Sequence, residues 1–310
     1  MSLDTAEVQS KRYTPDEAFA FCANITNAHY ENFPVASLFL PEEKRPYIQA
    51  IYAFSRIADD FADEQNRPPE ERLHDLNDWG EQLRQCYEGK TEHPVFIALS
   101  ETVKRNNIPI EPLQNLLTAF KRDVTQNRYE TFEDLLSYCS CSANPVGRLV
   151  LMIFGHRDDS LFKLSDDICT ALQLANFWQD VAVDVKKDRL YIPIEDMKKY
   201  RYGLDEWVNG AMNERFKQLM KFEVERTREM FYRGAQLLPL VERELQFELK
   251  LIWLGGMAIL RRIEKNQFDT IRRRPALNFS DKLLILLRAL YYNDVTRYGK
   301  KKQSWVLTQP

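Results

Sequence analysis

The sequence predicts an all-α protein, and three observations support this fold class. Glycine and proline are scarce, at 10 and 14 of 310 residues. Apolar residues recur at spacings of three and four along most of the chain, which is the period of one helix face. No stretch alternates apolar and polar residues between turn signals, as paired strands would. We therefore expect a helical bundle, and a single domain over residues 1–310, because no linker, repeat or change in composition divides the chain.

The first predicted helix runs from Pro41 to about Glu64. Proline suits the first turn of a helix, where its missing N–H has no partner to lose. Ile48, Ile51 and Ala58 fall on one broad face of this segment. The same reasoning predicts further helices at about 69–87, 93–105, 110–127, 131–154 and 160–186.

After Pro193 we expect an irregular passage through Gly203, and then helices at about 208–237, 239–265 and 280–294. Pro145 should kink the helix predicted at 131–154 and free a carbonyl near residue 141, and Asn144 adds an amide at the bend. The pair Gly255-Gly256 lies inside a predicted helix, where glycine is costly. It therefore predicts close packing against a ligand or another helix.

The charge balance excludes one class of partner. Lys and Arg number 43 and Asp and Glu number 46, which gives a net charge of −3. No basic excess is available for a nucleic-acid surface. The start lacks the pattern of a signal peptide, and the five cysteines read as reduced thiols, so we expect a cytoplasmic protein. Two short basic runs, 272–274 and 300–302, are either solvated ends or sites of weak peripheral contact with the inner face of a membrane.

Two acidic motifs are the strongest functional signal. Asp59-Asp60-Phe61-Ala62-Asp63 and Asp180-Val181-Ala182-Val183-Asp184 each place two aspartates four residues apart. On a helix this spacing puts both carboxylates on one face, where they repel each other unless a cation binds. Oxygen-only ligands indicate Mg²⁺, which commonly binds phosphate oxygens as well. In a bundle, we expect the two motifs to face each other across the interior.

Polar residues before the second motif follow the same helical register. Gln173, Asn176, Asp180 and Asp184 step by three, four and four, between apolar neighbours. The alternative is a solvated face, but such a face usually mixes Lys and Glu and avoids amides and Asp, which have poor helix propensity. The stripe therefore favours a functional site.

These residues resemble a known family, the squalene and phytoene synthases, which are head-to-head trans-isoprenyl diphosphate synthases. The resemblance extends from about residue 29 to 274 and is carried by Tyr52 to Glu64, Tyr138-Cys139, Leu172 to Asp184, and Asp188 to Pro193. It implies an isoprenoid-synthase bundle with a central cavity. Two ordered acidic motifs with a trailing Arg-x-Tyr-x-Pro are far more specific than a lone Asp pair.

Within this family the chain is most similar to the bacterial hydroxysqualene synthases of hopanoid and squalene formation. Three segments carry this finer resemblance, namely Glu31 to Ser37, Ser142 to Val150, and Asn176 to Val181. Squalene and phytoene synthases typically have Val-Ala-Gly-x-Val-Gly where this chain has Ser-Ala-Asn-Pro-Val-Gly. The resemblance implies Mg²⁺-dependent ionisation of presqualene diphosphate, rearrangement, and capture of water to give hydroxysqualene.

Two alternatives stay open. One is head-to-head condensation of two prenyl diphosphates, such as farnesyl diphosphate, to presqualene diphosphate, squalene, dehydrosqualene or phytoene. The other is a non-catalytic helical assembly partner that kept the fold. The leading reading also implies coupling to a presqualene diphosphate synthase and a hydroxysqualene reductase. Mg²⁺, or Mn²⁺ in its place, is the expected cofactor, and no NADPH is expected.

The resemblance also implies roles for individual residues. The metal ligands would be Asp59, Asp60, Asp63, Asn176, Asp180 and Asp184. The catalytic residues would be Tyr138, Asn144, Gln173, Asn176 and Tyr191. The substrate-binding residues would be Phe33, Ser37, Arg56, Val146, Gly147, Phe177 and Arg189. For Arg56 and Arg189 the alternative is an ordinary ion pair with the acidic motifs, and for Tyr138 it is plain packing.

Overall fold

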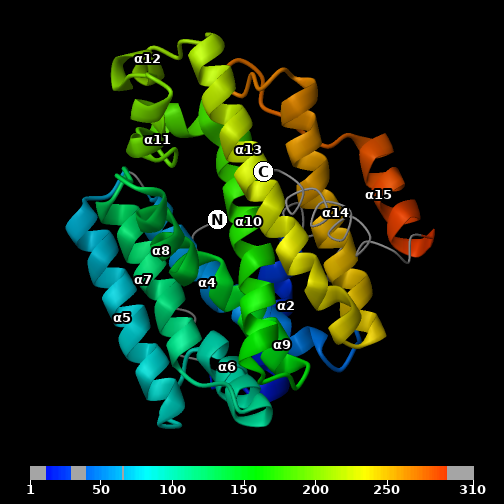
Figure 1. Ribbon diagram of the computed structural model, residues 1–310. Coiled ribbons are helices and arrows are strands. Elements are labelled where there is room, and N and C mark those ends of the chain that lie inside the picture. Colours follow the sequence, from blue (N-terminus) through cyan, green and yellow to red (C-terminus); the bar gives the residue numbers. More distant parts are fainter. Residues whose placement is uncertain (1–11, 29–39, 65, 292–310) are drawn as a thin grey trace. The chain divides into compact units, whose positions relative to one another are not determined.

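The computed structural model describes residues 12–28, 40–64 and 66–291, and this part of the chain is helical nearly throughout (Figure 1). Its described residues contain no strand; the sole bridge there joins Arg128 and Leu190. The all-α prediction is confirmed.

The described residues separate into two compact units. The first comprises the described parts of residues 1–126 together with 145–157, and the second comprises 127–144 and the described residues from 158 onward. The helices of the first unit are α2 (Pro15–Ala28), α4 (Arg45–Asp63), α5 (Pro69–Tyr87), α6 (Pro94–Asn106), α7 (Glu111–Thr125) and nearly all of α9 (Asn144–Ile153). The single-domain prediction stays a prediction.

The second unit contains the longer helices. They are α8 (Phe132–Ser142), α10 (Asp159–Asp184), η2 (Val185–Lys187), α11 (Ile194–Lys199), α12 (Leu204–Val208), α13 (Glu214–Gly234), η3 (Ala235–Leu240), α14 (Arg243–Lys265) and α15 (Phe279–Tyr291). No described helix is both long enough and apolar enough to cross a membrane.

In the first unit, α4 packs against α2, α5, α6 and α7. Phe54 on α4 is fully buried and its ring stacks on Trp79 of α5, while the Trp79 indole N–H donates to the Phe54 carbonyl at 3.2 Å. Phe96 of α6 completes this aromatic core. These contacts fix the buried face of α4 and leave the other face to carry the first acidic motif.

In the second unit, α10 packs against α8, α13 and α14, and Figure 1 shows α10, α13 and α14 side by side. The buried Trp178 indole donates to Thr227 of α13 at 2.7 Å. A Cβ on Gly256 would lie 2.3 Å from the ring of Phe231, so α13 and α14 approach too closely there for any side chain. A Cβ on Gly255 would meet nothing within 4 Å. The predicted close packing against another helix is therefore confirmed for Gly256, while at Gly255 no described helix lies close and packing against a ligand stays a prediction.

Three helix predictions are corrected. The segment at 131–154 forms two helices, because α8 ends at Ser142 and α9 begins at Asn144. Pro145, which has no N–H to donate, lies in the first turn of α9. The helix predicted from 208 begins at Glu214, since Gly210 has a φ of 60° and Asn213 caps the start by accepting from the Phe216 N–H. The passage predicted to be irregular through Gly203 contains α11, and neither α12, which follows that passage, nor α2 was predicted.

Candidate active site

The first acidic motif lies at the C-terminal end of α4. Arg56 precedes it by one turn, and its guanidinium donates to Asp59 Oδ2 at 3.2 Å and also pairs with Asp60. The Asp59 and Asp60 side chains are 42% and 46% exposed, and Asp63 is exposed as well. The structure therefore shows the ion-pair alternative for Arg56, and direct contact with a diphosphate stays a prediction.

The second acidic motif lies at the C-terminal end of α10, where Arg274 binds Asp180 in a bidentate pair. Nη2 of Arg274 donates to Oδ2 at 3.1 Å, and Nε donates to Oδ1. The buried Gln179 side chain donates to the Pro275 carbonyl at 2.6 Å and so fixes the same segment on α10. Neither reading of the basic run at 272–274 predicted this pair.

Asp184 is the carboxylate of the second motif whose pKa is shifted by its surroundings. Burial, and secondarily the Asp180 charge, raise the pKa of Asp184 to about 7. Arg189, Lys187 and Arg274 lower the pKa but do not offset the burial. A cation bound near Asp184 would lower this pKa, because its charge stabilises the ionised carboxylate.

The amides of the stripe lie on the accessible side of α10. Asn176 is exposed and Gln173 is half-buried, whereas Leu174, Ala175 and Trp178 are buried. From Leu174 to Val181, only Asn176 and Asp180 are not buried, so the predicted polar register is present on this part of the helix. Accessibility alone leaves the solvated-face alternative open.

Tyr138 and Tyr191 belong to an aromatic cluster with Phe177 and Tyr129. The rings of Phe177 and Tyr191 stack with centroids 3.7 Å apart at 6°, and Tyr129 stacks on Tyr191 at 5.8 Å. Tyr138 is buried and its ring lies 6.2 Å from Phe177. The structure thus brings three predicted residues together and adds Tyr129, while the choice between packing and a functional hydroxyl for Tyr138 stays a prediction.

Backbone hydrogen bonds position the segment that contains Arg189 and Tyr191. The Arg189 N–H donates to the Asp184 carbonyl at 2.9 Å, and the Leu190 N–H donates to the Asn127 carbonyl at 2.9 Å. Arg189 is half-buried beside the second motif, where its charge lowers the pKa of Asp184. Tyr129 enters the cluster through this pairing of distant segments, which no spacing in the sequence reveals.

Asn144 lies at the break between α8 and α9. Its side-chain oxygen accepts a hydrogen bond from Thr170 Oγ1 of α10 at 2.8 Å. Val146 is 39% exposed and Gly147 is half-buried, both in the first turns of α9. Phe33 and Ser37 lie outside the described residues, as does the basic run at 300–302.

The donors present fit Mg²⁺ in kind. In the described part of the chain, no group of three or more His, Cys, Asp and Glu side chains gathers at one point. Each motif instead offers carboxylate oxygens in pairs one turn apart, and Asn176 adds an amide oxygen one turn before Asp180. Hard oxygen donors and few protein ligands are what Mg²⁺ prefers when phosphate oxygens complete its shell. The two motifs belong to different units, and their mutual placement stays a prediction.

Comparison with known proteins gives a consistent family. Residues 26–281 match the squalene/phytoene synthase family. A hydroxysqualene synthase of Sinorhizobium fredii is 30% identical over 82% of this chain and 86% of its own. A phytoene synthase of Arthrospira platensis is 27% identical over 88% of this chain and 92% of its own. The crystal structure of the squalene synthase HpnC from Alicyclobacillus acidocaldarius superposes with a TM-score of 0.79 at 40% identity, covering 82% of this chain and 96% of that one.

Proposed function

The chain belongs to the squalene/phytoene synthase family of isoprenoid synthases, and from this premise we propose that it converts presqualene diphosphate into hydroxysqualene and diphosphate. The observation that carries the choice within the family is the 30% identity to a hydroxysqualene synthase over 82% of this chain. The helix break at Ala143 falls within the segment Ser142 to Val150 that carries the finer resemblance, and Asn144 there accepts a hydrogen bond from Thr170.

The proposal assigns Mg²⁺, or Mn²⁺ in its place, to the two acidic motifs. Asp59, Asp63, Asp180 and Asp184 would hold the metal, with Asp60 and Asn176 in support. Bound Mg²⁺ supplies neutralisation of the charge that develops on the departing diphosphate. These aspartates hold cations and do not transfer protons in the proposed reaction.

The arginines bind and orient the diphosphate in this proposal. A guanidinium matches phosphate oxygens with two parallel N–H donors. Arg274 already presents such a fork to Asp180, and Arg189 lies beside the same motif. Arg56 does the same at the first motif through Asp59 and Asp60. We propose that these arginines exchange carboxylate contacts for phosphate contacts when substrate binds.

The reaction cleaves the carbon–oxygen bond to the diphosphate, whose oxygen keeps the electron pair. The remaining cation rearranges, and a water oxygen then forms the new carbon–oxygen bond and loses a proton to solvent. No hydride is consumed, which is why the proposal includes no NADPH. The faces of Phe177 and Tyr191 offer π density to a cation, and the amides of Gln173 and Asn176 add polarity without a charge that would trap it.

The test is incubation of the purified protein with presqualene diphosphate and Mg²⁺ in the absence of NADPH. Hydroxysqualene as the main product is the expected result, and an absence of turnover would overturn the proposal. A parallel incubation with farnesyl diphosphate alone examines the rival, condensation of two prenyl diphosphates. The 27% identity to a phytoene synthase and the fit to the squalene synthase HpnC favour keeping that rival in view.

A non-catalytic helical partner is the remaining alternative. The intact acidic motifs and their ion pairs argue against it. An Asp180→Ala chain that leaves the cellular product unchanged would restore it. For the enzyme, we propose a cytoplasmic location, supply by a synthase of presqualene diphosphate, and consumption of the alcohol by a reductase.

A further inference from the structure

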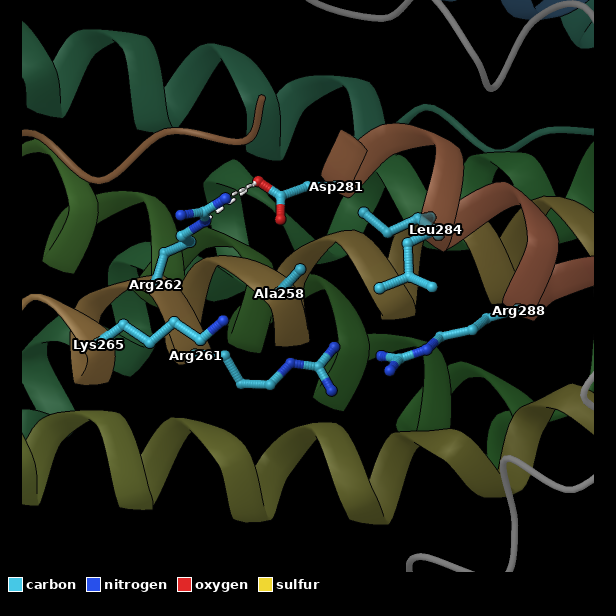
Figure 2. A pocket seen from close by; sticks show the side chains of 8 residues that line it. Ala258, Arg261, Arg262, Lys265, Asp281, Leu284 and Arg288 are labelled. Carbon is cyan, nitrogen blue, oxygen red and sulfur yellow. Dashed lines mark hydrogen bonds and ion pairs between the residues drawn. The ribbon is translucent and has the colours of Figure 1, made fainter. Parts of the chain in front are cut away.

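A basic hollow lies between α14 and α15 and shares no residue with the candidate active site. Its volume is about 140 Å³. The lining side chains are Ala258, Arg261, Arg262 and Lys265 from α14, and Asp281, Leu284, Ile285 and Arg288 from α15 (Figure 2). On each helix these residues follow the spacing of three, four and seven that defines one face, so the two helices enclose the hollow along matching faces.

The hollow carries an excess of positive charge. Four of its lining side chains are cationic and one, Asp281, is anionic. Arg262 pairs with Asp281 through Nε at 3.1 Å, which offsets that one acid. The guanidinium groups of Arg261 and Arg288 point toward one another from the two helices in Figure 2, and Lys265 lies on the same side of α14. With Lys265 on one helix and Arg288 on the other, the cationic lining favours an anion in the hollow.

An apolar stripe on α15 adjoins the hollow. The exposed fractions are 82% for Phe279, 47% for Leu283, 46% for Leu284, 43% for Leu287 and 56% for Leu290. Steps of three and four place these side chains on one face of a helix about 20 Å long. We call this set the α15 stripe. A contiguous exposed apolar patch of this kind marks an interaction site, since isolated exposed leucines do not line up along a helix.

Basic residues flank the α15 stripe on both sides. At 100° per residue, Arg288 falls next to Leu284 at one edge of the stripe, and exposed Lys282 falls beyond Phe279 on the other side. Buried Ala289, seven residues after Lys282, lies on the side of the helix away from the stripe. An apolar face bordered by Lys and Arg is the pattern of a helix that lies in a membrane interface.

We propose that α15 docks on an anionic phospholipid surface, with the α15 stripe in the acyl boundary and a headgroup phosphate in the basic hollow. Charge complementarity commits the surface to this occupant. The chain as a whole has a net charge of −3, so the positive charge here is a local concentration. A second copy is disfavoured, because a two-fold contact of antiparallel α15 helices would bring Lys282 of each copy near Arg288 of the other, and like charges repel. The proposal does not depend on the reaction catalysed.

The first experiment is flotation of the full chain with vesicles of phosphatidylcholine alone or mixed with phosphatidylglycerol. We expect binding to the anionic vesicles that weakens as salt rises from low to physiological ionic strength, and little binding to neutral vesicles. Equal binding to anionic and neutral vesicles would overturn the assignment of a headgroup phosphate to the basic hollow. A chain that binds inorganic diphosphate at Arg288 but no vesicle would identify a free-anion site and overturn the membrane proposal.

Two double variants separate the charge from the apolar contribution. Lys265→Gln with Arg288→Gln should weaken vesicle binding by about 25-fold, since each charge near an anionic surface contributes about fivefold. Leu283→Ser with Leu287→Ser should weaken it by at least about tenfold by removing buried apolar area.

Matched controls lie elsewhere in the same unit. Lys163→Gln with Lys221→Gln removes the same charge from exposed positions on α10 and α13, and Leu204→Ser with Val208→Ser removes exposed apolar side chains from α12. Both controls should bind like the unmodified chain, and circular dichroism melts verify that all four variants fold. Equal loss in variants and controls would overturn the proposal. If instead the unmodified chain dimerises without binding vesicles, and Leu283→Ser with Leu287→Ser makes it monomeric, the α15 stripe is a contact between copies.

Discussion

The two acidic motifs have the same spacing in the sequence and different surroundings in the structure. Asp59 and Asp60 are nearly half exposed, and their arginine, Arg56, comes from the preceding turn of the same helix. Asp180 is held by Arg274, which lies 94 residues later in the chain. Its neighbour Asp184 is buried enough that its pKa rises to about 7. Equal spacing therefore specifies which carboxylates share a face, while the elements packed around them decide their electrostatic state.

The largest expected effect compares the loss of a carboxylate from each motif. Under the proposed function, Asp180→Ala should lower kcat/KM for presqualene diphosphate by at least about 1000-fold, because it removes a cation ligand and leaves Arg274 without its carboxylate. Asp59→Ala should have a comparable effect if both motifs serve one reaction. Asp167→Ala, which removes a carboxylate paired with Arg233 near the other end of α10, is the control and should keep near-normal turnover. More than a tenth of normal activity in Asp180→Ala would contradict the assignment.

Replacing Arg274 or Arg56 tests whether an arginine from a distant segment and one from the same helix affect their acidic motifs differently. Arg274→Gln should lower kcat/KM at pH 7 by about 100-fold, since under the proposed function the diphosphate loses a bidentate guanidinium donor. Because the Arg274 charge lowers the pKa of Asp184, its removal should also shift the acid limb of the pH–rate profile to higher pH. Arg274→Lys should keep the limb near its normal position, and Arg56→Gln should not move it. An unshifted acid limb in Arg274→Gln would contradict the proposed effect of the Arg274 charge on the ionisation of Asp184.

Glu248 on α14 isolates the contribution of burial. Both of its carboxylate oxygens are buried without a hydrogen-bond partner, and burial alone raises its pKa from 4.5 to about 8. The folded chain thus holds this proton more tightly than the unfolded chain. Its contribution to stability is present below about pH 4.5 and is lost as the pH rises toward 8.

Glu248→Gln should therefore stabilise the fold by roughly 2 kcal/mol at pH 9 and change it little at pH 4.5. Thermal melts of both chains across this range are the measurement. Exposed Glu229→Gln on α13 is the control and should show no such pH-dependent difference. A constant difference at all pH values would mean that shape, and not ionisation, sets the effect.

Metal binding should reveal the protonation of the second motif directly. Since the pKa of Asp184 is about 7 in the metal-free chain, a cation must displace a proton below that pH. Affinity for Mg²⁺ should fall by up to about tenfold per pH unit below 7 and level off above it. Titration calorimetry measures both the affinity and the released proton. Asp184→Asn should abolish the pH dependence, and a flat profile in the unmodified chain would contradict the assignment.

The smallest expected effect concerns the helix break. Thr170→Val removes the donor to Asn144 and should destabilise the fold by about 1 kcal/mol, the usual net contribution of one hydrogen bond. Under the proposed function it should also raise the fraction of products other than hydroxysqualene, measured by product analysis. Thr118→Val, on the exposed side of α7, is the control and should change neither quantity. Unaltered products with lower stability would reduce Asn144 to a structural role.

The fold was predictable from sequence because helix periodicity is a local property. α10 was predicted to within two residues at either end, and the pair of Arg56 with the first motif follows from a spacing of three and four. Arg274 and Tyr129 could not be predicted, since each reaches its partners through segments far apart in the chain. The raised pKa of Asp184 depends on burial by those same segments. The spacing of residues along the sequence carries no information on that burial.

Gly255 and Gly256 on α14 differ in the space available for a side chain. Any side chain at 256 would collide with Phe231, so that position is held to glycine by the contact between two helices. Position 255 faces open space, and alanine there would gain about 1 kcal/mol of helix propensity. A methyl group can therefore be introduced at 255 without meeting a neighbouring atom of the described chain, whereas none can be introduced at 256. One residue of this pair fixes the architecture, and its neighbour is free to be adjusted.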